Sequence, residues 1–361
     1  GKNHGVVAIL DLSGSMSPSF RGAMDQLICL AMFCRRVGIP HRFYGFTSVI
    51  GGADVSTELY NSKRNQRKTL ISNIHRRLGA KAFVVPDSDF DLLELFHEGM
   101  NLKEFNTMVG ALLVQATRFG SSYYNDHTDE YVTSKGYSTS YEMLLKNLGG
   151  RAMNYFSLGG TPLNDAILVS RDLLRKFRKE KNVEIMNYIC ITDGESNHST
   201  YIDQYGQRRS LDYSTGKMVT RIFVDEESRL QTTIRFQDPT GITGMFSRVV
   251  SQSEDARFVG FYIAGNHYDI RNAIYRYIPF AEQEKMKAKM NKEGSIIIPG
   301  MLNFEEFYLI RGGKNLQAQQ AKFDEAKDMK KGQLARAFIS AQNKRGASRV
   351  ILGRFIAKIA A

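Results

Sequence analysis

The stretch VVAILDLSGSM, residues 6–16, decides the fold of this chain. Its first five residues, Val6–Leu10, are apolar and partly β-branched, which is typical of a buried strand. The strand ends at Asp11, and Ser13, Gly14 and Ser15 follow on a short turn. The segment Arg21–Val37 then has the length and apolar content of a helix that stops at Gly38. A buried strand followed by a polar turn and a helix predicts the first unit of an α/β fold.

Three later apolar runs have the same character as Val6–Leu10, and a second helical pattern at Leu163–Lys179 precedes one of them. These runs are Arg42–Phe46, Met186–Ile191 and Arg257–Ile263. Because continuous apolar strands that alternate with helices must be covered on both faces, they predict a doubly wound, mostly parallel sheet.

Two stretches interrupt this alternation, and we predict that both are insertions in one domain spanning residues 1–280. Residues 50–150 carry extra helical patterns, including Leu70–Leu78 and Asn101–Thr117. Residues 197–240 contain two alternating segments, Val219–Val224 and Leu230–Phe236, on either side of Asp-Glu-Glu-Ser, a pattern typical of a β-hairpin.

Residues 281–361 are predicted to form a basic, mainly helical C-terminal extension. From Lys314 onward this part has eleven Lys and Arg against three acidic residues. Its last segment, Ser348–Ala361, repeats apolar residues on one side and basic residues on another. It can be a helix docked on the domain, an arm that binds a partner, or a nucleic-acid contact. Because the chain begins without Met, just before a core strand, we expect it to be the C-terminal portion of a longer protein.

Bulk composition limits the classes of protein that fit. The net charge of +12 among 361 residues favours acidic partners, which include nucleic acid, membrane surfaces and acidic protein segments. We find neither an apolar run near the ~18 residues that cross a bilayer nor a signal-peptide pattern. The three cysteines, Cys29, Cys34 and Cys190, lie in apolar segments and are too few for a disulfide framework, so we expect core thiols in a reducing, cytoplasmic compartment.

Two further segments carry oxygen side chains where a helix begins or a strand ends. LGGTPLNDAI places Thr161 on a glycine-rich loop before Pro162, and ICITDGES ends an apolar run at Asp193. The serines after Asp11 alone can be ordinary turn or helix-capping residues. Carboxylate and hydroxyl oxygens on three such termini are also the hard ligands that Mg2+ prefers.

DLSGSM, GGTPL and TDGE, in this order on an alternating β/α pattern, resemble the metal-ion-dependent adhesion site (MIDAS) of von Willebrand factor A (VWA) domains. The resemblance implies that Ser13, Ser15 and Thr161 coordinate one Mg2+ through their hydroxyls, with Mn2+ or Ca2+ as substitutes. It also implies that Asp11 and Asp193 balance the charge, acting through water. The remaining coordination position would accept a carboxylate from a partner.

The long insertion after the second strand and the C-terminal extension also resemble CobT-like proteins, cobaltochelatase subunits whose relatives include bacteriophage-encoded ones. The resemblance implies a cytoplasmic adaptor, in the bacterial host if phage-encoded, for a MoxR/CobS-like AAA+ ATPase or another acidic partner. It implies binding without catalysis by the chain itself, and homo-oligomers fit such a role. Two alternatives stay open: a cobaltochelatase subunit that takes part in metal insertion into a tetrapyrrole, and an RNA-binding VWA scaffold.

Histidines and basic clusters have two readings each. His97, His127, His198 and His267 are isolated in the sequence and are expected in loops, although His198 and His267 follow core strands on the metal side and can form its rim. The basic clusters are solvated faces or contacts for an acidic partner or RNA. They are Lys63–Lys68, His75–Arg77 and Arg175–Lys181.

Overall fold

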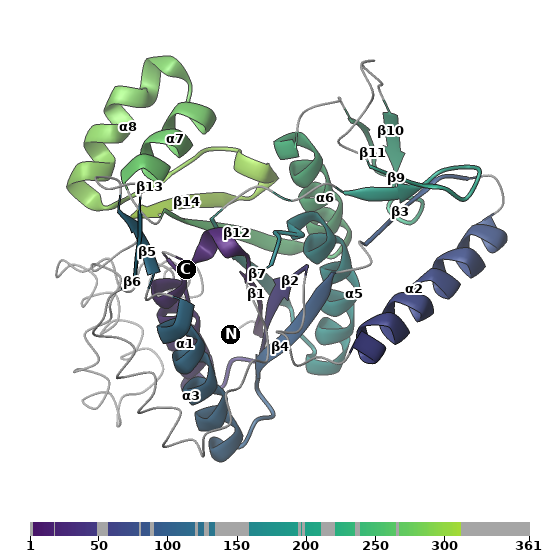
Figure 1. Ribbon diagram of the computed structural model, residues 1–361, viewed down its shortest axis with the longest axis horizontal. Coiled ribbons are helices and arrows are strands. Elements are labelled where there is room, and N and C mark those ends of the chain that lie inside the picture. The colour runs from purple at the N-terminus through teal and green to yellow at the C-terminus, as the bar shows by residue number, and fades with distance from the viewer. Residues whose placement is uncertain are drawn as a thin grey trace.

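A seven-stranded sheet lies at the centre of the computed structural model (Figure 1), in the order β13-β14-β12-β7-β1-β2-β4. The structure describes residues 3–17, 19–48, 57–78, 81–86, 90–119, 122–125, 130–133, 159–193, 196, 199–210, 221–234, 239–264 and 267–311. The strands of the sheet are β1 His4–Asp11, β2 His41–Thr47, β4 Asp91–His97, β7 Ile185–Thr192, β12 Ala256–Ala264, β13 Ser295–Ile297 and β14 Glu306–Arg311.

The five inner strands run parallel, and the two edge strands run antiparallel to their neighbours. β1 lies between β2 and β7, with Ala8 opposite Phe43 on one side and Ile189 on the other. Every β1 residue after His4 is buried, because helices cover both faces of the sheet. The four predicted buried strands and the mostly parallel sheet are therefore confirmed.

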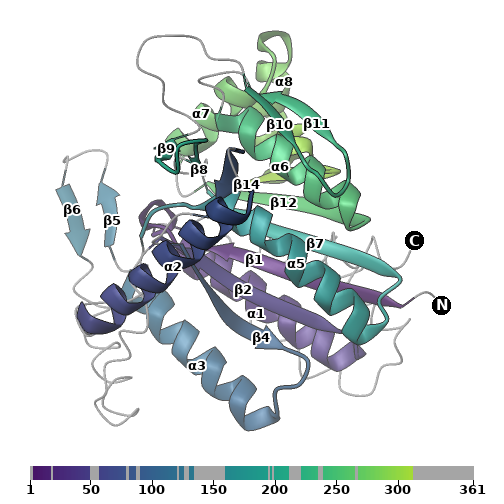
Figure 2. The same cartoon turned by 90° about the vertical axis from the view of Figure 1, so that its right-hand side faces the viewer.

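Helices cover the two faces of the sheet unequally (Figure 2). On one face α1 (Phe20–Val37) and α3 (Leu102–Phe119) pack against each other and on the apolar side chains of the sheet. On the other face lie α5 (Leu163–Lys181), α6 (Pro239–Ser253) and α7 (His267–Tyr277), followed by α8 (Phe280–Glu293). α1 ends where Gly38 adopts a left-handed conformation with φ of 73°, as the sequence indicates.

The region 50–150 is not the purely helical insertion that the sequence predicts. It contains α2 (Thr57–Leu78) and α3, but β4 lies between them and forms one edge of the central sheet. β4 was missed because its sequence, DLLELFH, has polar residues at both ends and one in the middle. Two more short strands in this region, β5 (Ser122–Asn125) and β6 (Glu130–Thr133), pair with each other.

The region 197–240 contains the predicted hairpin and a second small sheet. β10 (Arg221–Val224) and β11 (Gln231–Ile234) pair antiparallel, which confirms the hairpin. β8 (Thr200–Ile202) and β9 (Arg208–Ser210) form a second hairpin, and β3 (Phe83–Val85) pairs with β8. The two interruptions of the α/β pattern are thus joined through β3 and β8.

The C-terminal boundary predicted at residue 280 is too early. β13 and β14 belong to the central sheet, so the α/β unit extends at least to Arg311. A 3-10 turn, Met301–Asn303, connects them, and both strands carry core side chains such as Ile296 and Leu309. The basic segment from Lys314 lies outside the described residues.

The three cysteines are buried thiols without disulfide bonds, as expected of core residues. No helix in the described part of the chain combines the length and the apolar character needed to cross a membrane.

Candidate metal site

The candidate site lies at the carboxyl ends of the central parallel strands. β1 ends at Asp11 and β7 at Thr192, so that Asp193 follows directly beside the β1 turn. In open α/β sheets this edge is where ligands bind, because the loops that leave neighbouring strands form a crevice there. The short 3-10 turn Gly14–Met16 carries Ser15 over the same edge.

A continuous series of hydrogen bonds connects four of the five predicted residues. The Asp11 Oδ1 accepts from the Ser13 backbone N–H at 2.9 Å. The Ser13 and Ser15 Oγ atoms are 3.0 Å apart, and the Ser15 Oγ donates to Asp193 Oδ1 at 3.0 Å. Because a hydroxyl has one proton and Ser15 gives its proton to Asp193, Ser13 is the donor in the serine pair. Residues from two strand ends therefore converge on one point.

The loop that carries Thr161 is fixed to the same turn by its backbone. The Gly14 N–H donates to Gly159 O at 2.8 Å, and the Gly159 N–H donates to Leu12 O at 3.2 Å. Ser13 and Gly159 form an isolated parallel bridge. Thr161 follows two residues later and is 7% exposed. Backbone pairing at Gly159 thus fixes the loop that carries Thr161 against the β1 turn.

Sequence reasoning missed two serines that hold this arrangement. The Ser48 Oγ, directly after β2, accepts from the Gly160 N–H at 2.7 Å. The Ser196 Oγ accepts from the Asn164 N–H at 2.9 Å, which connects the segment after β7 to the start of α5. Both follow core strands at the carboxyl edge, and that position is the signal that could have identified them.

Burial and mutual repulsion make the two carboxylates costly to ionise together. Burial raises the pKa of Asp11 to about 6, although hydrogen bonds from Thr192 and Ser13 oppose the shift. Burial, followed by the charge of Asp11, raises the pKa of Asp193 to about 8. A cation between the two would favour the ionised forms of both groups.

The residues present fit a magnesium ion. Mg2+ binds oxygen ligands octahedrally at about 2.0–2.1 Å, so neighbouring ligands lie about 3 Å apart. The Ser13–Ser15 and Ser15–Asp193 oxygen separations, 3.0 Å each, agree with that spacing. The Asp11 oxygens already accept from Ser13 N–H and, at 2.7 Å, from the Thr192 hydroxyl. Both Asp11 carboxylate oxygens are therefore already engaged within the protein.

A third carboxylate, on α7, lies within electrostatic range of this site. Asp269, in the first turn of α7, contributes to the raised pKa of Asp193 and of Tyr262 on β12. The cause is topological, since β12 pairs with β7 with Tyr262 opposite Thr192, and α7 begins shortly after β12. The sequence motif gave no signal for Asp269, because α7 lies outside its three segments.

The two described histidines named in the sequence analysis lie at opposite ends of the parallel strands. His267 is the exposed first residue of α7, on the metal side, which keeps the rim hypothesis open. His97 ends β4 at the opposite edge, where its Nδ1 accepts from the Gly99 N–H. His127 and His198 lie outside the described residues.

The basic cluster Arg175–Lys181 is largely engaged within the fold. Arg175 pairs with Glu254 at 2.6 Å and with Glu227 at 2.8 Å. Arg178 donates to four backbone carbonyls around the end of α5 and the turn before β12. Arg175 and Arg178 thus hold α5 to its neighbours, whereas Lys176 of the same cluster is 69% exposed.

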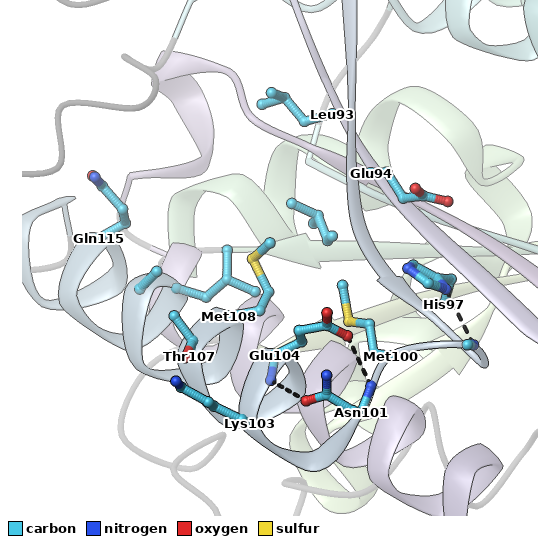
Figure 3. A pocket seen from close by; sticks show the side chains of 14 residues that line it. Leu93, Glu94, His97, Met100, Asn101, Lys103, Glu104, Thr107, Met108 and Gln115 are labelled. Carbon is cyan, nitrogen blue, oxygen red and sulfur yellow. Dashed lines mark hydrogen bonds between the residues drawn. The ribbon is translucent and has the colours of Figure 1, made fainter.

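A cavity of about 980 Å³ lies away from the candidate metal site, between edge strand β4 and α3 (Figure 3). Its walls are mainly apolar, with Leu93, Met100 and Met108 among them. Two of its polar side chains cap α3: the Asn101 Oδ1 accepts from the Glu104 N–H, and Glu104 Oε2 accepts from the Asn101 N–H. This reciprocal capping box uses those two side chains for local structure.

Within the described residues, no three or more His, Cys, Asp or Glu side chains gather as a metal-binding group. The candidate site differs from such groups, because it combines two carboxylates with three hydroxyls. Its donor set therefore favours a hard cation over a transition metal.

Comparisons with known proteins leave the family unassigned. Neither the models of known protein families nor the curated proteins gave a match to this chain. Among solved structures, the open conformation of the pilus adhesin SpaC from Lactobacillus rhamnosus GG is similar over 75% of this chain, with 13% identity and a TM-score of 0.35. The match spans only 26% of that adhesin. A similarity of this level assigns neither a family nor a function.

Proposed function

We propose that this chain is a VWA-type interaction module that binds one Mg2+ at its MIDAS and takes a carboxylate from a protein partner. The observation that carries the proposal is the hydrogen-bonded convergence of Asp11, Ser13, Ser15 and Asp193 beside the Thr161 loop. These groups come from three separate segments, and all lie at the ligand-binding edge of a parallel sheet.

In this proposal the hydroxyls of Ser13, Ser15 and Thr161 hold the ion, while Asp11 and Asp193 balance its charge. The bound ion supplies an electrophilic position for a carboxylate oxygen. The chain's own contribution is to orient the hydroxyls: Gly159 pairs with the β1 turn and Ser48 fixes the neighbouring Gly160. Nothing in this arrangement requires turnover, and its chemistry is that of reversible adhesion.

We further propose, on the resemblance to CobT-like proteins, that the partner is a MoxR/CobS-like AAA+ ATPase or an acidic segment of its target. The net charge of +12 supports an acidic partner. The chain would then act as the adaptor that connects the ATPase with its client.

Isothermal titration calorimetry with Mg2+ tests the metal site directly. The wild-type chain is expected to bind one ion, and Asp11→Ala is expected to remove the signal. The matched control is Asp172→Ala, which removes an exposed carboxylate on α5. Equal Mg2+ binding by Asp11→Ala and the wild type would contradict the proposed site.

The adaptor role needs a separate measurement. A purified MoxR/CobS-like ATPase is captured on the immobilised protein with Mg2+ and with EDTA. Recovery is expected to require both Mg2+ and Asp11. Recovery that is unchanged by EDTA and by Asp11→Ala would exclude a metal-bridged adaptor.

A further inference from the structure

One exposed surface combines aromatic and basic side chains next to the candidate metal site. On α7, Tyr268, Arg271 and Tyr275 occupy positions i, i+3 and i+7, so they lie along one side of the helix. Tyr268 is 62% exposed and Tyr275 47% exposed. These exposed aromatic side chains do not contribute to the core, because α7 packs on the sheet through its opposite side.

The stripe continues onto α8. Phe280 and Lys287 lie seven residues apart on that helix, and the Lys287 Nζ donates to the Tyr275 hydroxyl at 3.0 Å. Phe280 is 89% exposed. We call these five residues, Tyr268, Arg271, Tyr275, Phe280 and Lys287, the aromatic–basic face; Figure 1 shows α7 and α8 beside β13 and β14.

Internal contacts hold the side chains of this face in place. The Arg271 guanidinium lies 5.6 Å from the centre of the Tyr275 ring, and the Lys287 Nζ lies 4.4 Å from it. Glu284 pairs with Lys287 at 2.6 Å, which partly balances its charge. Ordered Tyr and Arg side chains lose little conformational entropy on binding, and they are the residue types that dominate binding energy in protein interfaces.

The aromatic–basic face begins next to the candidate metal site, at the start of α7. β12 and β7 are neighbours in register, with Tyr262 opposite Thr192, and α7 begins at His267 just beyond the end of β12. The α7 stripe then extends away from the strand ends. From Tyr268 to Tyr275 it covers about 10 Å, the length of roughly three extended residues.

The charge of the two helices favours an acidic ligand with apolar side chains. α7 and α8 together carry six basic and four acidic residues. The basic residues are Arg271, Arg276, Lys285, Lys287, Lys289 and Lys292, and the acidic ones are Asp269, Glu282, Glu284 and Glu293. This modest surplus, mixed with exposed aromatic rings, suits a protein segment better than a polyanionic backbone.

We propose that the aromatic–basic face is the recognition surface for the acidic protein segment whose carboxylate reaches the MIDAS. The inference rests on the proposed function and adds the direction in which the partner runs: from the metal along α7 toward α8. A carboxylate provides the metal contact, and apolar and acidic residues a few positions away contact Tyr275 and Arg271. Binding at two adjacent points makes selectivity depend on the spacing between them.

The test uses a phage-displayed library of random 12-residue peptides, selected on the full chain in Mg2+. Selected peptides are expected to contain an acidic residue and to lose affinity in EDTA. Tyr275→Ala and Arg271→Glu are each expected to weaken them at least about tenfold. The matched controls are Tyr205→Ala, which removes a 75% exposed tyrosine on the β8–β9 turn, and Arg76→Glu on the exposed side of α2.

The outcomes separate the two hypotheses. Peptides that need Mg2+ but ignore Arg271 and Tyr275 would overturn this inference and leave the proposed function standing. Peptides whose affinity depends on both residues but is unchanged by EDTA and by Asp11→Ala would overturn the metal-bridged function. They would still support the aromatic–basic face as a peptide-binding surface. Absence of any enriched peptide counts against the inference, and so does tighter, competing binding of a dT15 oligonucleotide, which would assign the face to nucleic acid.

Discussion

The buried ion pair between Arg171 and Asp225 offers a quantitative test of how the β10–β11 hairpin is held to α5. Arg171 binds Asp225 through two hydrogen bonds of 2.6 and 3.0 Å, and their side chains are 17% and 11% exposed. Hydrogen bonds to charged groups contribute about 1.5–3 kcal/mol each. Asp225 keeps its donors from Ser228 when Arg171 is removed, so we expect Arg171→Met to lower the free energy of unfolding by about 3 kcal/mol.

The next acidic residue provides a matched control. Glu226 pairs with Lys81 at 2.8 Å, but these side chains are 67% and 69% exposed. Solvent screens such a pair, so Lys81→Met is expected to cost much less than Arg171→Met. Both variants are measured by urea denaturation at pH 7. Equal, small losses in the two variants would refute the argument that burial makes the Arg171 pair the stronger one.

The pH dependence of the same pair has a defined sign. Burial raises the pKa of Asp225, but the hydrogen bonds from Arg171 and Ser228 outweigh it and hold the pKa below its ordinary value of 3.8. The stability from this group is therefore complete above that value and is lost as the pH falls through the lower folded pKa. The difference between the wild type and Arg171→Met should narrow below about pH 4. A difference that stays constant down to pH 2.5 would contradict this sign.

Three other predictions concern the metal, the packing and a buried histidine. Mg2+ at about one hundred times its dissociation constant should stabilise the wild type by about 2.7 kcal/mol, and Asp193→Asn should remove this gain in thermal melts. Gly260→Ala should lower the free energy of unfolding by about 1–3 kcal/mol, because its Cβ would lie 2.2 Å from the Phe307 ring. Gly110→Ala, in the open middle of α3, should raise the free energy of unfolding by up to about 1 kcal/mol. Unfolding curves that rank the two variants the other way would contradict the packing argument. Burial lowers the pKa of His41, so the folded state resists its protonation and stability should fall as the pH drops through its ordinary value of 6.5. A His41→Gln variant should flatten this slope in denaturation midpoints between pH 7.5 and 5.5, and an unchanged slope would exclude His41 as its source.

The sequence predicted the four central strands β1, β2, β7 and β12 and missed β4 and β14 of the same sheet. Val6–Leu10 and Met186–Ile191 are continuous apolar runs, because helices cover both sides of β1 and β7. β4 lies at an edge of the sheet, where one side of a strand can carry polar residues, whereas β14 has four consecutive buried residues, Phe307–Ile310, and was missed although it has the pattern of a central strand. In β4 the exposed Glu94 interrupts the apolar pattern that identifies a central strand.

The candidate site could be predicted where oxygen-bearing side chains directly follow a strand. It could not be predicted where residues distant in the sequence hold those side chains in place. Asp11, Ser13 and Ser15 lie within one short turn, so local sequence places them together. Ser48 serves the site only because the Thr161 loop folds back against β2. That contact spans 112 positions, and no local pattern encodes it.

The distance along the chain between the site's segments also determines when the site can exist during folding. Asp11 and Thr192, which share a hydrogen bond, are 181 positions apart, and the β1–β7 pairing that brings them together encloses the whole 50–150 region. Such contacts of high sequence separation carry a large loop-closure cost and form slowly. A nascent chain that ends within β7 lacks Asp193, one of the five proposed site residues, and cannot yet hold the other four against it. The proposed Mg2+ site therefore requires the β1–β7 pairing, and Mg2+ binding during refolding would report on that pairing.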